Sequence, residues 1–254
     1  MEHALIVKDL KKVYKNGTQA LKGVSLEVPK GDFFALLGPN GAGKTTIIGI
    51  VSGLVNKSSG NASVFGYDID KQAEMAKAQI GLVGQEINFN PFEKPLDIVV
   101  NQGGYYGIPR SVAIPRAKQL LQDLGLGDKM TGNSMQLSGG MKRRLMIARA
   151  LIHKPKFLIL DEPTAGVDVQ LRHSMWEYLK KLTAEGVTIL LTTHYLEEAE
   201  QLAKHVAIIN KGEIVAMGTM DEILATHDTQ EETSGYRGGR LERIFLKLTA
   251  DDSK

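Results

Sequence analysis

Cysteines, long apolar runs and an excess of one charge are all missing from this sequence. Its 254 residues contain no cysteine, which excludes disulfide bonds, thiolate zinc sites and a cysteine nucleophile. The longest apolar stretches, such as residues 47–55, are broken by glycine and serine and fall short of the ~20 residues of a membrane helix. The 31 basic and 29 acidic residues leave a formal charge of +2, which predicts no strong attraction to nucleic acid or to an acidic membrane surface.

The remaining composition is that of a globular protein. With 43% apolar residues, the chain can bury a real core, as one large domain or as two unequal lobes. The first residues, Met1 to Leu5, include an early acid and no sustained apolar segment, so they do not resemble a secretory signal. We therefore expect the chain to stay in the cytosol. If it serves a membrane, other subunits must cross that membrane.

Two kinds of pattern follow one another along the chain. The first thirty residues alternate apolar and polar positions around the turn Lys15-Asn16-Gly17, which predicts short antiparallel strands. From Phe33 onward, short apolar runs alternate with stretches of helical period, as is typical of buried parallel strands joined by crossover helices. The runs that predict such strands are residues 33–37, 80–83, 157–160, 187–191 and 206–209.

The middle and the end of the chain lack this alternation. Between about residues 86 and 150 we expect a mostly helical inserted lobe, with turns at Asn90-Pro91, Gly103-Gly104 and Ile108-Pro109 and a helix over residues 116–124. Residues 1–225 would form one domain that contains this lobe. Residues 226–254 would form a polar linker followed by a short amphipathic helix.

A glycine-rich loop follows the first apolar run. It fits the pattern G-x-x-x-x-G-K-[ST] and precedes a run of helical period, residues 46–54. In such a loop, backbone N–H groups converge on phosphate oxygens, Lys44 reaches the outer phosphates, and the Thr45 hydroxyl can hold Mg²⁺. The residues predicted to bind the nucleotide here are Gly38, Pro39, Asn40, Gly41, Ala42, Gly43, Lys44, Thr45 and Thr46. The expected fold class is therefore an α/β P-loop core with a mainly parallel sheet, an N-terminal antiparallel β subdomain and an inserted α-helical subdomain. GTPases, kinases and many ATPases share such a loop.

Two adjacent acids end a later apolar run. Asp161 and Glu162 follow residues 157–160, so they emerge at the carboxyl end of a parallel strand, where ligands bind in such sheets. Neighbouring residues of a strand point to opposite faces, which allows Asp161 to support Mg²⁺ and Glu162 to orient or deprotonate an attacking water. Alone, acids after a strand are ordinary loop residues. Together with a phosphate loop they indicate hydrolysis of a nucleoside triphosphate.

A second anion site is predicted between these two features. In Leu137-Ser138-Gly139-Gly140-Met141, Ser138 caps a helix, and the two glycines allow close approach to its free N–H groups. Here the chain resembles the nucleotide-binding subunits of ABC transporters. The resemblance implies ATP as ligand and a head-to-tail dimer in which Ser138, Gly139, Gly140 and Met141 close on the ATP of a second copy or of a homologous ATPase subunit.

The resemblance extends over residues 4–217 and implies further roles. Tyr14 matches the aromatic residue that stacks on adenine, and Gln85 matches the glutamine that meets Mg²⁺ and the attacking water. His194 matches the histidine that contacts the γ-phosphate, so the implied catalytic residues are Glu162 and His194. Asp168 matches the aspartate of a loop that crosses the dimer interface. Alone, each of these residues has an ordinary structural explanation.

Departures from the family pattern point toward one branch of it. Met141 stands where glutamine is most frequent, Gly84 stands where proline is common, and residues 164–168 read Thr-Ala-Gly-Val-Asp. That loop and residues 241–249 resemble the exporter type of subunit. The resemblance implies integral membrane permease partners and a place on the cytoplasmic face of the membrane, held there by the permease. Aromatic residues within 89–106 would either contact the permease or belong to a local core.

Two other functions remain open at this point. One is a soluble ABC-superfamily ATPase that acts on nucleic acid or on the ribosome. Such proteins typically carry long coiled coils, zinc modules or two fused ATPase cores, and this sequence has one set of motifs and no cysteine, so we expect no direct binding to nucleic acid. The other is a GTPase or metabolic kinase, which would leave the serine-glycine-glycine motif unexplained.

Overall fold

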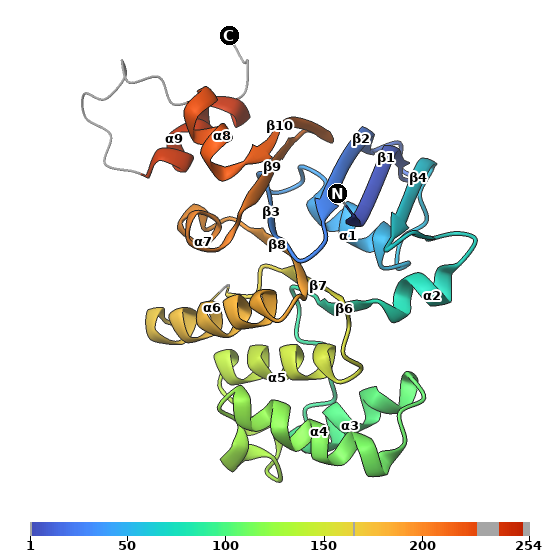
Figure 1. The fold of residues 1–254 in the computed structure, drawn as a ribbon, viewed down its shortest axis with the longest axis vertical. Helices are drawn as coiled ribbons and strands as arrows, with labels where there is room; N and C mark the ends of the chain where they lie inside the picture. Colours follow the sequence, from blue (N-terminus) through green and yellow to red (C-terminus); the bar gives the residue numbers. More distant parts are fainter. Residues whose placement is uncertain (1, 165, 228–238, 251–254) are drawn as a thin grey trace. The chain divides into compact units, whose positions relative to one another are not determined.

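The computed structural model describes residues 2–164, 166–227 and 239–250. These residues belong to two compact units (Figure 1). The first unit combines Met1–Lys77 with Thr188–Lys254, and the second is Ala78–Val187. The predicted helical lobe, residues 86–150, falls within the second unit, which also includes strands and a helix on either side of that range.

An antiparallel sheet opens the first unit. Strands β1 (His3–Val13) and β2 (Gln19–Pro29) pair from His3–Pro29 to Val13–Gln19, and β4 (Ser59–Val64) pairs with the other edge of β1. The short strand β5 (Tyr67–Asp68) completes the order β2-β1-β4-β5. Alternate positions of β2 are buried, which confirms the predicted antiparallel strands. Strand β4 escaped prediction because most of its residues are small and polar.

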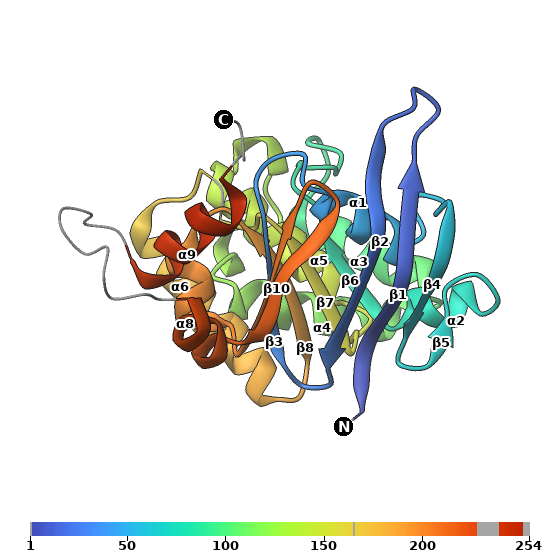
Figure 2. The same ribbon diagram turned by 90° about the horizontal axis from the view of Figure 1, so that it is seen from above.

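The second group of strands in this unit is mainly parallel. Strands β8 (Thr188–Thr193) and β9 (His205–Asn210) both pair in parallel with β3 (Phe33–Leu37), as the apolar runs predicted. Strand β10 (Glu213–Thr219), the orange strand labelled in Figure 2, lies antiparallel to β9 at the edge of the group. None of its residues is fully buried, and the sequence analysis did not predict this strand although residues 214–217 are apolar.

Helices of the first unit connect and cover these strands. Helix α1 (Lys44–Val51) packs on β2 and β4, and α2 (Ala73–Ala78) follows β5. Beyond β8 come α7 (Leu196–Leu202), α8 (Met220–His227) and α9 (Arg240–Thr249). Helix α9 packs on α7, α8 and β9 through its apolar side, which includes the buried Leu241.

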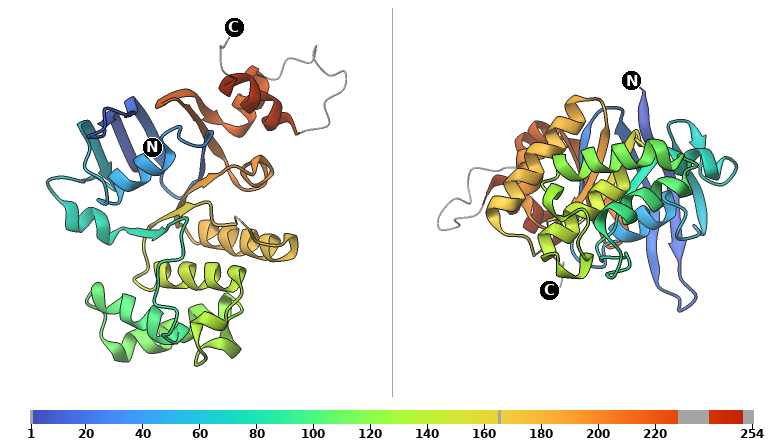
Figure 3. Two further views of the ribbon diagram at one scale, coloured as in Figure 1. Left: turned by 180° about the vertical axis from the view of Figure 1, so that it is seen from behind. Right: turned by 90° about the horizontal axis from the view of Figure 1, so that it is seen from below.

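The second unit pairs a short parallel ladder with a group of helices. Strands β6 (Ile80–Val83) and β7 (Phe157–Asp161) run parallel, as predicted. Helices α3 (Pro95–Tyr105), α4 (Arg110–Asp123) and α5 (Gly139–Leu151) pack against one another and are drawn in green to yellow-green in Figure 3. The last helix of the unit is α6 (Val169–Ala184). Short 3₁₀ helices occupy Gly127–Lys129 and Ser134–Gln136.

Three local predictions differ in part from the structure. Gly103 and Gly104, expected in a turn, lie in the last turn of α3. The absence of a side chain at Gly103 allows close packing there, since a Cβ atom would crowd Ala113 and Ile152. The helix expected at residues 116–124 begins at Arg110 and includes Pro115.

The linker was expected to begin at residue 226, but helix α8 continues through His227. Residues 228–238 of that linker lie outside the described part of the chain. Among the described helices, none is both long and apolar enough to cross a membrane.

Candidate nucleotide-binding site

The glycine-rich loop joins the carboxyl end of β3 to the first turn of α1. Gly41 and Gly43 adopt φ angles of 80° and 118°, a region in which residues with a side chain are rarely found. Gly43 is also the N-cap of α1, and a Cβ atom there would lie 2.7 Å from a methyl carbon of Leu21. The loop therefore needs glycine both for its backbone path and for its packing on β2.

Lys44, the loop lysine, is held from inside the loop. Its buried side chain donates hydrogen bonds from Nζ to the carbonyl oxygens of Gly38 at 2.6 Å and Pro39 at 3.0 Å. Thr45 is exposed in the first turn of α1, where the free N–H groups of a helix favour an anion. The loop thus presents an ammonium group, a hydroxyl and helix N–H groups along one short segment.

Tyr14 lies beside this segment. Its hydroxyl oxygen is 3.3 Å from the Thr46 hydroxyl oxygen, and the ammonium of Lys12 lies 4.9 Å from the ring centroid. The side chain is 38% exposed, so part of the ring surface is available for stacking. Lys12 was not among the predicted residues. Its contact with Tyr14, which directly follows the end of β1, is a cation–π interaction.

His194 lies at the same edge of the parallel strands as the phosphate loop. Leu37 and Thr193 are paired neighbours in β3 and β8, so the residues that follow them, Gly38 and His194, leave the sheet at the same level. The His194 ring is exposed and tilts against Tyr195 with the ring centroids 4.2 Å apart. The backbone of this turn is fixed by the Thr193 hydroxyl, which accepts a hydrogen bond from the Tyr195 amide at 3.0 Å.

The acids and Gln85 meet in the second unit. Val83 and Leu160 are paired in β6 and β7, so the segments that follow them emerge together. Asp161 is buried, and Glu162 carries a φ angle of 50°, an uncommon value for a residue other than glycine. The Gln85 side-chain amide donates to Oε2 of Glu162 at 3.1 Å. This contact joins two predicted site residues that are far apart in the sequence.

Arg143 is a residue that the sequence analysis missed. Its guanidinium donates at 2.8 Å to the carbonyl oxygens of both Gly84 and Gln85. Burial lowers the pKa of Arg143, while the nearby Asp161 and Glu162 act in the opposite direction. The sequence could have indicated a buried, paired arginine here, because Arg143 is the one charged residue on the helix face that carries the apolar Ile147.

The serine-glycine-glycine motif forms a capped helix start, as predicted. Ser138 is the N-cap of α5, and its hydroxyl accepts a hydrogen bond from the Met141 amide at 3.3 Å. Ser138 and Gly139 are exposed, whereas Gly140 is buried against Leu171 of α6. The exposed helix start can receive an anion from outside the subunit.

Asp168 also caps a helix. Its carboxylate accepts a hydrogen bond from the Leu171 amide at 2.9 Å at the start of α6, and its side chain remains exposed. Gly166 precedes it with a φ angle of 71°, and Ala165 lies outside the described residues. The cap gives Asp168 a structural role that sequence reasoning did not assign.

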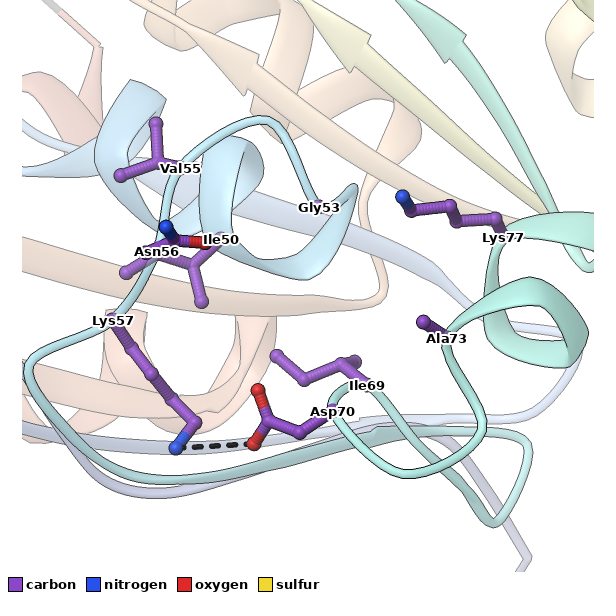
Figure 4. Close-up of a pocket in the computed structure, with 9 residues that line it drawn as sticks. All are labelled: Ile50, Gly53, Val55, Asn56, Lys57, Ile69, Asp70, Ala73 and Lys77. Carbon is purple, nitrogen blue, oxygen red and sulfur yellow. Dashed lines mark ion pairs between the residues drawn. The ribbon is translucent and has the colours of Figure 1, made fainter.

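The predicted residues thus form two groups. Tyr14, the phosphate loop and His194 belong to the first unit, and the remaining predicted residues belong to the second. The first unit also contains a cavity of about 400 Å³ (Figure 4). It lies beyond the C-terminal end of α1, where Lys57 forms an ion pair with Asp70, and no predicted nucleotide-binding residue lines it.

A phosphate loop after a parallel strand, with an acid pair at the end of another, defines a P-loop nucleoside triphosphatase. The family profile described as "ABC transporter" matches residues 21–165. The linearmycin resistance ATP-binding protein LnrL of Bacillus subtilis is 43% identical over 86% of this chain and 70% of that protein. The Nod factor export ATP-binding protein I of Cupriavidus metallidurans is 40% identical over 98% of this chain and 82% of that protein.

Solved structures agree with this assignment. The ATP-binding subunit of an ABC transporter superposes with a TM-score of 0.84 and 29% identity, covering 96% of this chain and 99% of the other. A dimeric ATP-binding cassette in a post-hydrolysis state, bound to ADP and phosphate, superposes with a TM-score of 0.77 and 27% identity over 85% of this chain and 98% of the other. This chain belongs to the ABC transporter family, and it is an ATP-binding, ATP-hydrolysing subunit.

Proposed function

We propose that this ATPase powers export across a membrane through ATP-driven closure of a head-to-tail dimer. The observation that carries the catalytic part is the hydrogen bond from Gln85 to Glu162, since it brings together a water-positioning amide and a candidate general base. The export part follows the similarity to the linearmycin resistance and Nod factor export proteins.

In this proposal the first unit binds the nucleotide. Lys44 and the loop N–H groups hold the phosphates, and Tyr14 stacks on the adenine. Mg²⁺ would be held by Thr45, Gln85 and Asp161, whose hydroxyl, amide and carboxylate oxygens are ligands that this hard cation prefers. When bound, the ion neutralises charge that develops on the phosphates during hydrolysis.

Glu162 and His194 carry the chemistry. The Glu162 carboxylate accepts a proton from the attacking water, and Gln85 orients the two groups. Strain at Glu162, with its φ of 50°, is compatible with a side chain held in place for a reaction. His194 contacts the γ-phosphate and stabilises the charge that forms on it.

A second subunit completes each site. The exposed N-terminus of α5, with Ser138, Gly139, Gly140 and Met141, closes on the γ-phosphate held by the partner. Asp168, at the exposed start of α6, contributes to the same interface. A dimeric arrangement occurs in the related cassette bound to ADP and phosphate. The partner is a second copy of this chain or a homologous ATPase subunit.

Integral membrane permease subunits are the second kind of partner. Phe92 and Tyr105 are 71% and 86% exposed, which leaves large aromatic surface available for docking. Tyr106 differs, because it is 37% exposed and one face of its ring is covered by His153, with a centroid distance of 3.6 Å. The chain would act at the cytoplasmic face of the membrane, attached through the permease.

Replacement of Glu162 by glutamine tests the catalytic role. We expect turnover to fall about 10²- to 10⁴-fold while ATP binding remains, since the amide keeps the shape of the side chain but cannot accept the proton. ATP should then trap a dimer that size-exclusion chromatography detects. Glu177→Gln, on the exposed side of α6, is the control and should hydrolyse ATP normally. Wild-type hydrolysis by Glu162→Gln would refute the assigned role.

Purification from the native membrane tests the transport role. A membrane-spanning subunit should co-purify with the chain, and Phe92→Ala combined with Tyr105→Ala should release it without loss of ATP binding. A chain recovered in soluble form on ribosomes or DNA would contradict the transport function and support the nucleic-acid alternative.

A further inference from the structure

Arg143 occupies a position where a charge is costly unless it is fully paired. It lies in the first half of α5 and is 6% exposed, among buried residues that include Leu145, Met146 and Ile147. Its two terminal nitrogens donate to two successive carbonyl oxygens, those of Gly84 and Gln85, each at 2.8 Å. The guanidinium group is a rigid planar fork, so two such bonds fix both the position and the direction of the peptide chain.

The segment that Arg143 holds is the one that presents Gln85. The Gln85 side chain in turn donates to Glu162 at 3.1 Å. Gly84 has no side chain, and nothing lies within 4 Å of the position that a Cβ atom would take there. The two hydrogen bonds from Arg143 therefore restrain this stretch of backbone, from which Gln85 reaches Glu162, where no side chain of Gly84 can do so.

The helix that carries Arg143 begins just after its N-cap, Ser138. Hydrogen bonds within α5 connect its N-cap to Arg143, so the N-terminus of the helix and the Gln85 loop move together if α5 moves. In the proposed dimer, Ser138 binds the partner's ATP while Gln85 serves the subunit's own ATP. Arg143 thus lies between contacts to two different nucleotides.

We propose that Arg143 is a positioning residue for ATP hydrolysis, which fixes Gln85 against Glu162 and couples the Gln85 loop to the helix that begins at Ser138. This inference rests on the roles proposed above for Gln85, Glu162 and Ser138. Arg143 transmits the engagement of Ser138 with one nucleotide to the site that hydrolyses the other. The two sites of a dimer then respond cooperatively to ATP.

Arg149 provides a matched control on the same helix. It is also a partly buried arginine that donates to the same loop, through the carbonyl oxygen of Asn88 at 3.0 Å, but it contacts neither Gly84 nor Gln85. Loss of packing or of a buried charge should affect Arg143→Met and Arg149→Met alike. Loss of Gln85 positioning should affect Arg143→Met alone.

Steady-state hydrolysis of ATP by the full chain, over a range of ATP concentrations, is the first measurement. For Arg143→Met we expect kcat to fall about 10- to 100-fold, KM to change little, and the dependence on ATP to lose its cooperativity. Arg143→Lys keeps the charge but lacks the fork, so it should lie between wild type and Arg143→Met. Arg149→Met should keep wild-type kcat and cooperativity, and equal loss in both methionine variants would overturn the proposal.

A double-mutant cycle with Gln85→Ala is the second measurement. If Arg143 acts through Gln85, adding Arg143→Met to Gln85→Ala should reduce kcat no further, whereas independent effects would multiply and overturn the proposal. If Arg143→Met does not fold, the kcat and cooperativity of Arg143→Lys test the proposal instead. Wild-type kcat and cooperativity in folded Arg143→Lys would refute the inference.

The same measurements distinguish failure of the proposed catalytic roles from failure of the positioning role alone. If Gln85→Ala and Glu162→Gln both keep wild-type turnover, the proposed catalytic roles are wrong, and the positioning role falls with them. If both reduce turnover while Arg143→Met does not, the catalytic roles stand and only the positioning role is refuted.

Discussion

Gly38 of the phosphate loop packs against the carbonyl oxygen of Ile209 so closely that a Cβ atom on Gly38 would lie 2.4 Å from it. A second contact joins the same segments, because the Gly212 amide donates to the Ala42 carbonyl at 3.0 Å. The turn between β9 and β10 therefore supports the phosphate loop from behind. The path of the loop depends on a segment distant in sequence.

Gly38→Ala should destabilise the protein by about 1–3 kcal/mol, because the clash is with backbone and cannot be relieved by a side-chain rotation. Urea unfolding and ATP titration would measure the loss of stability and of affinity. Gly104→Ala, in the last turn of α3 with open space around it, is the control and should be neutral or slightly stabilising. Equal stability of Gly38→Ala and wild type would contradict this packing argument.

Mixed dimers should recover ATPase activity from two inactive subunits. Lys44→Ala removes phosphate binding, and Ser138→Arg blocks the loop offered to the partner. A mixed dimer retains one intact site, so an equimolar mixture should recover turnover in a phosphate-release assay, up to roughly a quarter of the wild-type value, and less if the two sites cooperate. A mixture of Lys44→Ala with the double variant should stay inactive. Absence of recovery, with mixed dimers formed, would argue against shared sites.

Helix α9 should be held on the first unit by its two buried residues, of which Leu241 is one. Leu241 is fully buried, and its amide donates to Glu200 of α7 at 2.8 Å. Leu241→Ala should cost about 2–5 kcal/mol of local stability, visible as faster amide hydrogen exchange in α9. Leu246→Ala, on the same helix but 49% exposed, is the control and should exchange almost as slowly as wild type. Similar protection in both variants would contradict this packing.

Tyr178 should make stability fall at high pH. Burial, with smaller contributions from Asp123 and Glu185, raises the pKa of Tyr178 to about 12 in the folded protein. The unfolded chain ionises near pH ~10, so it loses its proton first, and the stabilisation is lost as pH rises from about 10 to 12. After allowance for partial exposure, we expect a loss of about 1–2 kcal/mol.

Tyrosinate absorbance separates this residue from the other tyrosines. The difference between wild type and Tyr178→Phe should titrate near pH ~12, and Tyr178→Phe should show a weaker decline of stability over this range. A difference spectrum that titrates near pH ~10 would refute the shifted pKa.

Strands that are buried along their whole length could be predicted directly from the sequence. Strands β3 and β8 are buried along their whole length, so their apolar runs marked them clearly. Strand β10 was not predicted although residues 214–217 are apolar, and the structure shows it as an edge strand whose residues are only partly covered. Gly103 and Gly104 misled the analysis, since glycine serves both turns and close helix packing.

The sequence by itself determined the chemistry available to the protein. The spacing of Gly38 to Thr45, the serine-glycine-glycine motif and the adjacent acids are local patterns, and local backbone geometry suffices to make each of them a phosphate- or cation-binding element.

Only the tertiary structure decided which of these elements touch. The bonds of Arg143 to the Gly84 and Gln85 carbonyls, and of Gln85 to Glu162, join segments that are far apart in sequence. Such contacts depend on the pairing of β6 with β7 and on the packing of α5 beside β6, which no local pattern specifies. A charged residue in a helix therefore became identifiable as a positioning residue only when its partners were known.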